Sequence, residues 1–284
     1  MKKIILLLIF GFTFTFLNAQ HKKAYTIYKA DGTKTDYHQM LEAVKQSDIT
    51  LFGEQHNSAI AHWLQYEITS DLLNEIIVTL GAEMFERDNQ SAINQYVSKE
   101  INQKQLDTLA RLWSNYKTDY KPLLDFAREK QLDFVATNIP RKYANMVFKQ
   151  GLTALDQLSE EEYNWIVPLP FPFDPNLPTS QKILTMMGDH GTPELVLAQA
   201  IKDATMAYSI EQNLRSGHLF LHYNGAYHSD YFEGIVWYLK RTQPQLKYLV
   251  ISTVTQKDIG SLEAEHLGKA DFIIVVDEKV TKTY

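Results

Sequence analysis

The 284-residue sequence contains no cysteine. This absence excludes a disulfide framework, a lipid-modified cysteine, a thiolate nucleophile and any metal site with cysteine ligands. A bound metal would have to be held by His, Asp, Glu, Asn or Tyr side chains. The GxSxG elbow, the phosphate-binding P-loop and the HExxH helix of zinc peptidases are also missing, which removes three common catalytic frameworks.

Long apolar runs are missing as well, except at the start. The segment MKKIILLLIFGFTFTFLNAQ begins with two lysines, continues with an apolar run from Ile4 to Leu17, and places the small Ala19 before Gln20. This order predicts a secretory signal peptide over residues 1–19, cleaved after Ala19. An uncleaved anchor helix is the alternative, although the run is shorter than the about 20 residues that span a bilayer. We therefore expect an exported protein of the bacterial periplasm, with no membrane span after cleavage.

The sequence is also short of positive charge. It carries 28 Lys and Arg residues against 34 Asp and Glu residues, a formal net charge of −6. Loss of residues 1–19 would delete two lysines and no acid, which changes the net charge to −8. Because nucleic acids and anionic membranes are bound by concentrated basic surfaces, neither is an expected partner.

What the sequence does contain is a series of short apolar, β-branched runs. They predict strands over Ile49–Phe52, Ile76–Phe85, Leu132–Thr137, Leu219–Tyr223, Tyr248–Thr253 and Asp271–Val276. Their alternation with helical patterns favours an α/β fold, in which helices flank a mostly parallel central sheet. The segment from about residue 89 to 215 is mainly helical, with a turn expected near Lys117–Pro122. We therefore expect residues 20–284 to form one α/β domain with this segment as an inserted helical subdomain.

Polar side chains follow two of the predicted strands at similar turns. The stretch LFGEQHNSAIAHW places Glu54 and His56 between a strand and a helix that Asn57 or Ser58 caps. The stretch LFLHYNGAYH repeats the arrangement, with His228 three residues after a glycine. Two Gly-x-x-His turns after strands indicate a site more strongly than either turn alone.

A third strand end adds a carboxylate, Glu83, in the stretch TLGAEMFERD. The carboxyl ends of parallel strands meet at one edge of a sheet, where ligands gather, so we expect His56, Glu83 and His228 to converge. Two histidines and a carboxylate can hold a divalent metal ion, or they can act as a general acid–base cluster. Three unrelated polar groups at strand ends are the remaining interpretation.

Other residues are weaker candidates for the same pocket. His62 and Tyr66 lie one turn apart on the first helix, although a single helical histidine is more often packed or at the surface. Arg141 follows the strand in LDFVAT, and its planar guanidinium could hold a carboxylate or phosphate group. Asp203 is a charge on an apolar helical face, so it needs a partner, such as Arg141 or a histidine.

Five stretches of the chain can be compared with known families: GEQHNSAIAHWLQYEI, GAEMFERDNQ, ATNIPRKYANMVFKQG, AQAIKDATMAYSI and NGAYHSDYFEGIVWYL. In this order they resemble the blocks of the ChaN-like haem-binding uptake family, part of the Tiki/TraB superfamily. The resemblance covers about Asp48 to Arg241. It implies an α/β core with an inserted helical subdomain, export, and a role in bacterial iron or haem acquisition. It further implies haem at a dimer interface, with a tyrosine as the iron ligand.

The resemblance also bears on individual residues. Superfamily members described as metal-dependent peptidases or esterase-like hydrolases use two Gly-x-x-His motifs, a glutamate and an arginine. The matching positions here are His56, His228, Glu83 and Arg141, with Glu54 beside them. No motif identifies the tyrosine that would bind haem iron. The candidates for haem binding are Tyr66, Tyr227, Tyr231 and His62.

Two functions stay open on this sequence. One is an exported protein that binds haem or another iron compound, with a homodimer among the assemblies that the resemblance implies. Haem-branch relatives are often lipoproteins, whereas this chain lacks the cysteine that would be modified. The other function is a divalent-metal-dependent hydrolase, peptidase or esterase-like, in which the two Gly-x-x-His motifs hold a metal or activate water.

Overall fold

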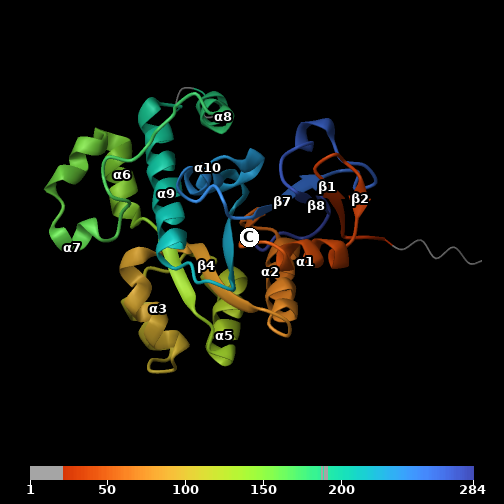
Figure 1. Ribbon diagram of the computed structural model, residues 1–284, viewed down its shortest axis with the longest axis horizontal. Helices are drawn as coiled ribbons and strands as arrows, with labels where there is room; N and C mark the ends of the chain where they lie inside the picture. The colour runs from red at the N-terminus through yellow and green to blue at the C-terminus, as the bar shows by residue number, and fades with distance from the viewer. Residues whose placement is uncertain (1–21, 187, 189–190) are drawn as a thin grey trace, which may run out of the picture.

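The computed structural model describes residues 22–186, 188 and 191–284 of the chain. The predicted signal peptide, residues 1–19, lies outside the described residues. Within the part described, no helix is long and apolar enough to cross a membrane. The centre of the molecule is an eight-stranded sheet with helices on both faces (Figure 1).

The sheet is mixed, but six adjacent strands run parallel. Its order is β2-β1-β8-β7-β3-β6-β4-β5, and only the contacts of β1 with β2 and with β8 are antiparallel. The parallel strands are β3 (Ile49–Glu54), β4 (Ile77–Glu86), β5 (Phe134–Asn138), β6 (His218–Gly225), β7 (Tyr248–Gln256) and β8 (Phe272–Asp277). Each matches a strand expected from the sequence, so the α/β prediction is confirmed. The pattern does not reveal β1 (Tyr25–Lys29) and β2 (Lys34–Thr35), which are short and form the antiparallel edge.

Alternate residues of the central strands enter two different cores. The helices that cover the faces are α1 (Tyr37–Lys45), α2 (Ala59–Leu72), α5 (Lys121–Lys130), α9 (Pro193–Gln212) and α10 (Ile235–Thr242). In β3, Phe52 joins the core with α1, α2 and α5, whereas Leu51 joins the core with α9 and α10. Figure 1 shows these two groups of helices on opposite sides of the sheet. All six residues of β3 are buried, as expected for a parallel strand covered on both faces.

The segment between β4 and β6 is mainly helical, and besides β5 it contains irregular stretches at residues 110–115 and 164–177. Its other helices are α3 (Gln90–Val97), α4 (Gln103–Leu109), α6 (Arg141–Gln150), α7 (Glu160–Tyr163) and α8 (Pro178–Met186). The helices α3 and α5 share a core with the sheet. By contrast, α6 builds a separate core with α9 around Tyr143, Val147 and Ile201. This third core holds α6 beside β5 and α9.

The prediction of a turn near Lys117–Pro122 is wrong. Residues Tyr116–Tyr120 instead form a π-helix that runs directly into α5, and the irregular stretch precedes it, at residues 110–115. The 3.6-residue periodicity used on the sequence has no signal for the wider π turn. Such turns are frequent at functional sites. This one carries Asp119 and Tyr120 to the end of β3.

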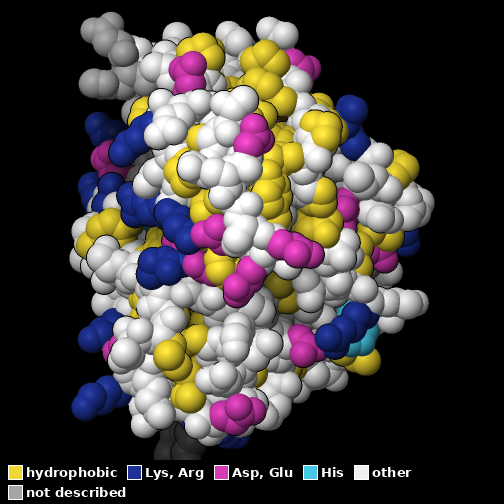
Figure 2. All heavy atoms as spheres, turned by 90° about the vertical axis from the view of Figure 1, so that its left-hand side faces the viewer, with side chains coloured by type: hydrophobic (Ala, Val, Ile, Leu, Met, Phe, Trp, Pro, Cys, Tyr) yellow, Lys and Arg dark blue, Asp and Glu magenta, His cyan; other side chains and the backbone are white. Residues whose placement is uncertain are grey.

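The outer face of the helical segment exposes apolar side chains. Figure 2 views the molecule from this side, and hydrophobic atoms gather in the upper half of that view. Phe148 of α6 and Phe173 of the loop before α8 are 40% and 37% exposed. This surface contrasts with the inner side of the same helices, which turns polar residues towards the strand ends.

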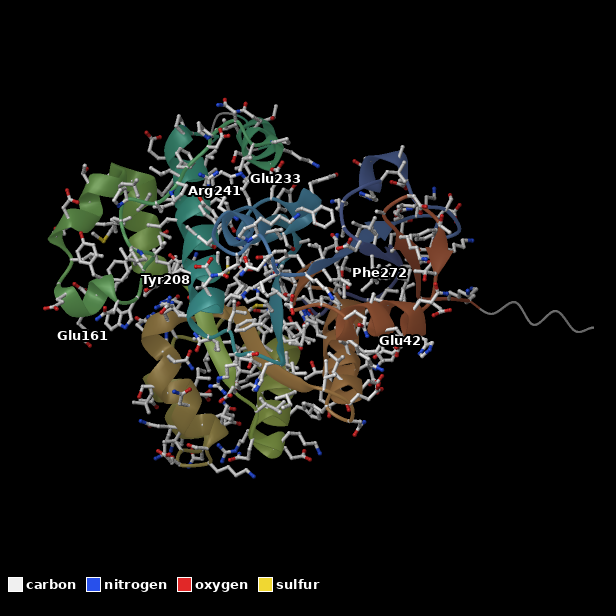
Figure 3. All side chains as sticks on the ribbon, viewed as in Figure 1. Glu42, Glu161, Tyr208, Glu233, Arg241 and Phe272 are labelled. Atoms are coloured by element: carbon white, nitrogen blue, oxygen red, sulfur yellow. The ribbon has the colours of Figure 1, made fainter. Side chains whose placement is uncertain are left out.

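The short helix α8 is fixed to the loop before α10. The backbone N–H of Thr179 donates a hydrogen bond to Glu233 Oε2 at 2.8 Å, and Glu233 is labelled in Figure 3. Since Thr179 is also 91% buried, the start of α8 is held in place. Lys182, one turn further along α8, lines the pocket that is described below.

One side chain completes the outer edge of the sheet at β5. The Nε2 group of Gln90 donates to the carbonyl oxygen of Phe134 at 2.9 Å, and its Oε1 accepts from the backbone N–H of Ala136 at 2.6 Å. These are the two contacts that a neighbouring strand would make with this part of β5. Gln90 therefore takes the place of a ninth strand over one residue pair.

Candidate functional site

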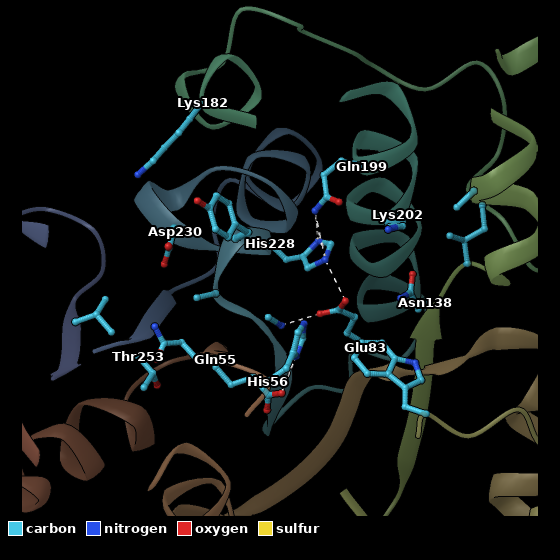
Figure 4. A pocket seen from close by; sticks show the side chains of 18 of the residues that line it. Gln55, His56, Glu83, Asn138, Lys182, Gln199, Lys202, His228, Asp230 and Thr253 are labelled. Atoms are coloured by element: carbon cyan, nitrogen blue, oxygen red, sulfur yellow. Dashed lines mark hydrogen bonds and ion pairs between the residues drawn. The ribbon is translucent and has the colours of Figure 1, made fainter. Parts of the chain in front are cut away.

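A pocket of about 780 Å³ opens at the carboxyl ends of the parallel strands. The order in which strands are added to the sheet reverses here, because β4 and β5 lie on one side of the pair β3–β6, and β7 and β8 lie on the other. Ligands of α/β sheets bind at such switch points. Six of the predicted site residues line the pocket: Glu54, His56, Glu83, Arg141, Tyr227 and His228. Figure 4 shows His56, Glu83 and His228 at its centre.

Glu54 and His56 form a carboxylate–imidazole pair at the end of β3. Glu54 is 2% exposed and accepts hydrogen bonds from His56 Nδ1 at 2.9 Å, Tyr120 Oη at 2.8 Å and Gln65 Nε2 at 2.7 Å. The contact with the carboxylate places a proton on Nδ1, so the neutral imidazole keeps Nε2 as an acceptor. Burial would lower the pKa of His56, but the bond to Glu54 and the charge of Glu83 raise it above its ordinary value. This is the geometry of an oriented general base.

The ring of His56 lies against the backbone of Gly225, at the end of β6. A Cβ atom at Gly225 would lie 2.8 Å from His56 Cε1 and 2.9 Å from His56 Nε2. Any larger residue would therefore displace the ring. The backbone N–H of Gly225 also donates to Glu83 Oε2 at 2.7 Å, which fixes that carboxylate beside His56. Gly225 of β6 thus contacts both His56, at the end of β3, and Glu83 of β4.

His228 lies between two buried carboxylates. Its Nε2 is 3.1 Å from Glu83 Oε1, and its Nδ1 pairs with Asp203 of α9. Burial would lower the pKa of His228, but the two carboxylates raise it to about 10. Burial opposes ionisation of Glu83, yet His228 holds the pKa of Glu83 well below its usual range, while burial raises that of Asp203. The imidazole is therefore charged near neutral pH, and the predicted pairing of Asp203 with a histidine is confirmed.

The backbone after His228 is held in an unusual conformation. Tyr231 and Phe232 both have φ of 60°, and Gly234 has φ of 54°. A Cβ atom at Gly234 would lie 2.3 Å from the carbonyl oxygen of His228. Positive φ in non-glycine residues is costly and persists only where the surroundings enforce it. The buried ion pair between Lys269 Nζ and Asp230 Oδ2, at 3.0 Å, anchors the same turn.

Of the three tyrosines predicted as candidates for haem binding, one lines the pocket and two do not. Tyr227 lines the pocket and is 41% exposed. Tyr66 does not line it and packs on Phe126, with ring centroids 4.9 Å apart. Tyr231 does not line it either, because its hydroxyl donates to the carbonyl oxygen of Glu265 at 2.8 Å. Tyr66 and Tyr231 therefore do not occupy the positions expected of them.

His62 is also not a wall of the pocket. It lies behind Glu54, with its Nδ1 3.4 Å from Glu54 Oε2 and its Nε2 3.1 Å from the carbonyl oxygen of His56. Its side chain is 8% exposed. His62 lies on α2, which Ser58 caps through a bond from the N–H of Ala61. His62 thus supports the Glu54–His56 pair from the rear.

Sequence reasoning missed several residues that complete the site. Tyr120 and Gln65 hold Glu54, Trp113 packs edge-on to His56 with centroids 5.1 Å apart, and Gln199 Nε2 lies 3.0 Å from His228 Nδ1. Gln65 could have been found, because it lies on the buried face of the helix that follows His56. The others come from segments with no strand-end motif, so the sequence offers no signal for them.

A family model described as "Haem-binding uptake, Tiki superfamily, ChaN" matches residues 40–239. The chain belongs to this family. No curated protein matches the sequence. Among solved structures, ChaN of Campylobacter jejuni, titled for cofacial haem binding, is 16% identical with a TM-score of 0.66, over 89% of this chain and 97% of that one. A Bacillus cereus protein is 12% identical with a TM-score of 0.51, over 84% and 90%. A succinoglycan biosynthesis protein is 11% identical with a TM-score of 0.52, over 87% and 94%. At these identities the structures show a shared fold.

The expectation of a divalent metal in this ChaN-family site is not supported by the donor set. Both ring nitrogens of His228 already face carboxylates, so neither is directed at an open position where a metal could bind. Among the described residues, the group with three ligand atoms mutually within 4.8 Å is Glu263, Glu265 and His266, on an exposed loop. His56, Glu83 and His228 thus form an ion-paired cluster rather than a prepared metal centre.

The family's cofactor can be tested against the same walls. A haem site needs an apolar slot for the porphyrin and an axial ligand for the iron. The walls around the two histidines are mostly polar or charged, and Trp113, Ile139 and Val254 are among the few large apolar side chains. The interior of the pocket therefore does not fit a porphyrin. The mouth does offer an axial ligand, because Tyr227 is exposed there.

Proposed function

We propose that this protein binds haem or a related iron compound outside the cytoplasm and serves bacterial iron or haem uptake. Membership of a haem-binding uptake family supports the ligand. The signal-like segment at residues 1–19 supports export, with the periplasm as the destination. The observation that carries the proposal is the position of Tyr227 at the mouth of the pocket.

Tyr227 would hold the iron. Of the tyrosines that the sequence singles out, it is the one that lines the pocket, and its side chain reaches solvent. Burial raises the pKa of Tyr227 above its ordinary value and the positive charge of Lys269 opposes this only in part, so ferric iron would have to displace the phenolic proton on binding. A bound haem would supply iron coordination and redox chemistry, and Tyr227 would keep it over the mouth rather than within the polar interior.

A haem held in this way would leave one porphyrin face uncovered. A second copy of the chain is the occupant that we propose for that face, which makes a homodimer part of the haem-bound state. Exposed apolar surface drives such association, since burying it is favourable by about 25 cal/mol per Å². Size measurement by light scattering, with and without hemin, tests whether the mass doubles on binding.

The haem proposal is tested by adding hemin to the purified apoprotein and recording the Soret band. We expect a shifted band in the wild type and its loss in Tyr227→Phe, because phenylalanine keeps the ring and removes the ligand oxygen. Tyr66→Phe and Tyr231→Phe are matched controls and should bind hemin like the wild type. An unchanged Soret band in the wild type, or an identical shift in Tyr227→Phe, would contradict tyrosine-ligated haem at this position.

A second function, hydrolysis, is favoured by the Glu54–His56 pair. His56 Nε2 would take a proton from a water molecule at the floor of the pocket, while Glu54 orients the imidazole and stabilises its charged form. Arg141 would hold an anionic part of the substrate. The two functions are compatible, because they use different side chains of the same pocket.

Hydrolysis is tested with 4-nitrophenyl acetate as the probe. We expect turnover to be lost in His56→Gln and retained in His218→Gln, since His218 begins β6 at its opposite end and does not line the pocket. A loss of turnover in EDTA, with stoichiometric metal in the untreated protein, would assign the reaction to the metal-dependent form. Equal turnover in His56→Gln and the wild type would contradict the proposal.

A further inference from the structure

One end of the pocket, between β5, α6 and α9, is lined by cationic and amide side chains. They are Asn138, Arg141, Asn145, Gln199 and Lys202. Neither Arg141 nor Lys202 forms an ion pair with any residue that the structure describes, whereas Lys269 at the other end is paired with Asp230. Figure 4 shows Asn138, Gln199 and Lys202 together on one side of the central histidines. The acidic residue at this end, Glu86, is paired with Arg111, so the charges of Arg141 and Lys202 are left without an ion-pair partner among the described residues.

The backbone adds to this positive end. Helix α6 has ten residues and begins at Arg141, directly after the chain leaves β5. Its N-cap is Pro140, which provides no side-chain hydrogen bond, and its first turn contains no acidic residue. The first N–H groups of a helix lack partners within the helix and carry a partial positive charge. Here no side chain satisfies that preference for an anion.

Asn138 supplies an independent observation that points to a ligand. It is 8% exposed, it lines the same end of the pocket, and its Oδ1 atom is buried without a hydrogen-bond partner among the described residues. A buried acceptor without a donor is unfavourable and is usually satisfied by water or by a ligand. Asn138 lies three residues before α6 begins. Its Oδ1 atom can therefore accept a hydrogen bond from a ligand beside the place where an anion would lie.

We propose that this end of the pocket is an oxyanion subsite, which binds a carboxylate or phosphate group that carries a hydrogen-bond donor next to it. Arg141 and Lys202 supply positive charge for the oxyanion, and the start of α6 supplies N–H groups that donate to it. Asn138 Oδ1 accepts a hydrogen bond from the neighbouring donor of the ligand. The inference deepens the proposed function, because it rests on the pocket being the ligand site. The oxyanion comes either from a free phosphate or hydroxy acid, or from a haem propionate at the mouth.

Two cation variants and one control test the subsite. Arg141→Gln and Lys202→Gln each remove a charge, and Lys149→Gln removes one from the exposed far end of α6, away from the pocket. Inorganic phosphate and malate are titrated by calorimetry at constant ionic strength. We expect saturable binding that weakens about tenfold or more in the first two variants, as for loss of a charge-assisted contact. Lys149→Gln should bind like the wild type.

A second arm identifies the source of the oxyanion. Hemin and its dimethyl ester, in which both propionates are neutral, are titrated by the Soret shift. A preference for hemin over the ester that disappears in Arg141→Gln supports the subsite with a propionate as its ligand. Saturable phosphate or malate binding that needs Arg141 and Lys202 supports it with a free oxyanion. If neither dependence is found, the subsite is wrong, even where hemin itself binds.

Asn138→Leu separates a ligand role from a structural one. Leucine has a similar shape and removes the unpartnered acceptor, so the midpoint of thermal unfolding should hold or rise. At the same time, the affinity for the donor-bearing malate should fall. A purely structural Asn138 would give the opposite result, a lower midpoint with unchanged affinity, and would overturn its part in the subsite. Absence of any Soret shift, by contrast, would count against haem binding alone.

Discussion

His56 and His228 occupy matching positions, three residues after a glycine at the ends of the neighbouring strands β3 and β6. Their surroundings are nevertheless opposite. The side chain of His56 is 37% exposed and has one nitrogen held by one carboxylate, whereas that of His228 is 7% exposed and lies between two. His228 is therefore a fixed positive charge, and His56 is a group that can gain or lose a proton. The same short motif provides a structural cation in one copy and a reactive group in the other.

The deciding difference is at Nε2, because Nδ1 of each histidine faces a carboxylate, Glu54 for His56 and Asp203 of α9 for His228. The Nε2 of His228 lies 3.1 Å from Glu83 Oε1, whereas the Nε2 of His56 faces Gly225, which has no side chain. A motif thus fixes where an imidazole lies, while residues from other elements decide its charge and access.

The largest expected effect comes from breaking the buried cluster. His228→Gln removes the cation and leaves Glu83 and Asp203 close together without a positive partner. Removal of one member of a buried ion pair typically costs about 3–5 kcal/mol, so we expect a loss of that order in the free energy of unfolding. Urea unfolding monitored by tryptophan fluorescence measures it. A loss below about 1 kcal/mol, the range of exposed pairs, would show that the cluster is solvated in solution.

The pH dependence of the same variant sharpens the comparison. The pKa of His228 is about 10 in the folded protein against 6.5 for an ordinary histidine. A raised pKa means that the charged form stabilises the fold, fully so below about pH 6.5 and progressively less as the pH rises towards 10. The gap in unfolding free energy between wild type and His228→Gln should therefore narrow over this range. A gap that is constant from pH 6 to 10 would refute the assigned charge.

An intermediate effect is expected from Gly225→Ala, which crowds the reactive histidine and leaves the buried one alone. The φ of Gly225 is −59°, so alanine fits the backbone and the effect is purely one of space. Overpacking of this kind costs about 1–3 kcal/mol, although the partly exposed ring of His56 can tilt to relieve it. Stability should recover in the double variant with His56→Ala. If the double variant is no more stable than Gly225→Ala, the ring is not the obstacle.

The smallest effect on stability is expected from His56→Gln. This side chain is partly exposed, its shorter side-chain hydrogen bond is to Glu54, and glutamine keeps a donor that can replace this bond, so we expect a loss of about 1 kcal/mol. The contrast with His228→Gln, measured in the same urea titration, is the direct test of the two roles. Comparable losses from both variants would remove the distinction.

The sequence predicts the parts of this molecule that depend on local pattern. Six strands follow from apolar runs, and the convergence of His56, Glu83 and His228 follows from parallel strands having their carboxyl ends at one edge. The roles of these residues in binding or catalysis stay predictions. What the pattern could not give is which face of a helix meets the pocket, so His62 lies behind the site rather than in its wall.

Contacts between segments that are distant in the sequence could not be predicted from the pattern either. Tyr120 lies in the π-helix before α5 and donates a hydrogen bond to Glu54, and no spacing of apolar residues encodes that π-helix. The charge of His228 depends on the distance to two carboxylates from β4 and α9, which only the folded chain defines. A histidine in a motif could thus be located from sequence, but its protonation state could not.

The side chain of Gln90 has a consequence for how copies of this protein can meet. An open sheet edge recruits strands from other molecules and leads to aggregation, and proteins block this in several ways. At β5 the amide of Gln90 already occupies the backbone groups that such a strand would use, and at the far edge β2 spans only two residues. Continuation of the sheet from one molecule into the next is therefore disfavoured at both ends. The proposed dimer would then form through side-chain surfaces, and the strand ends that carry the histidines stay available for it.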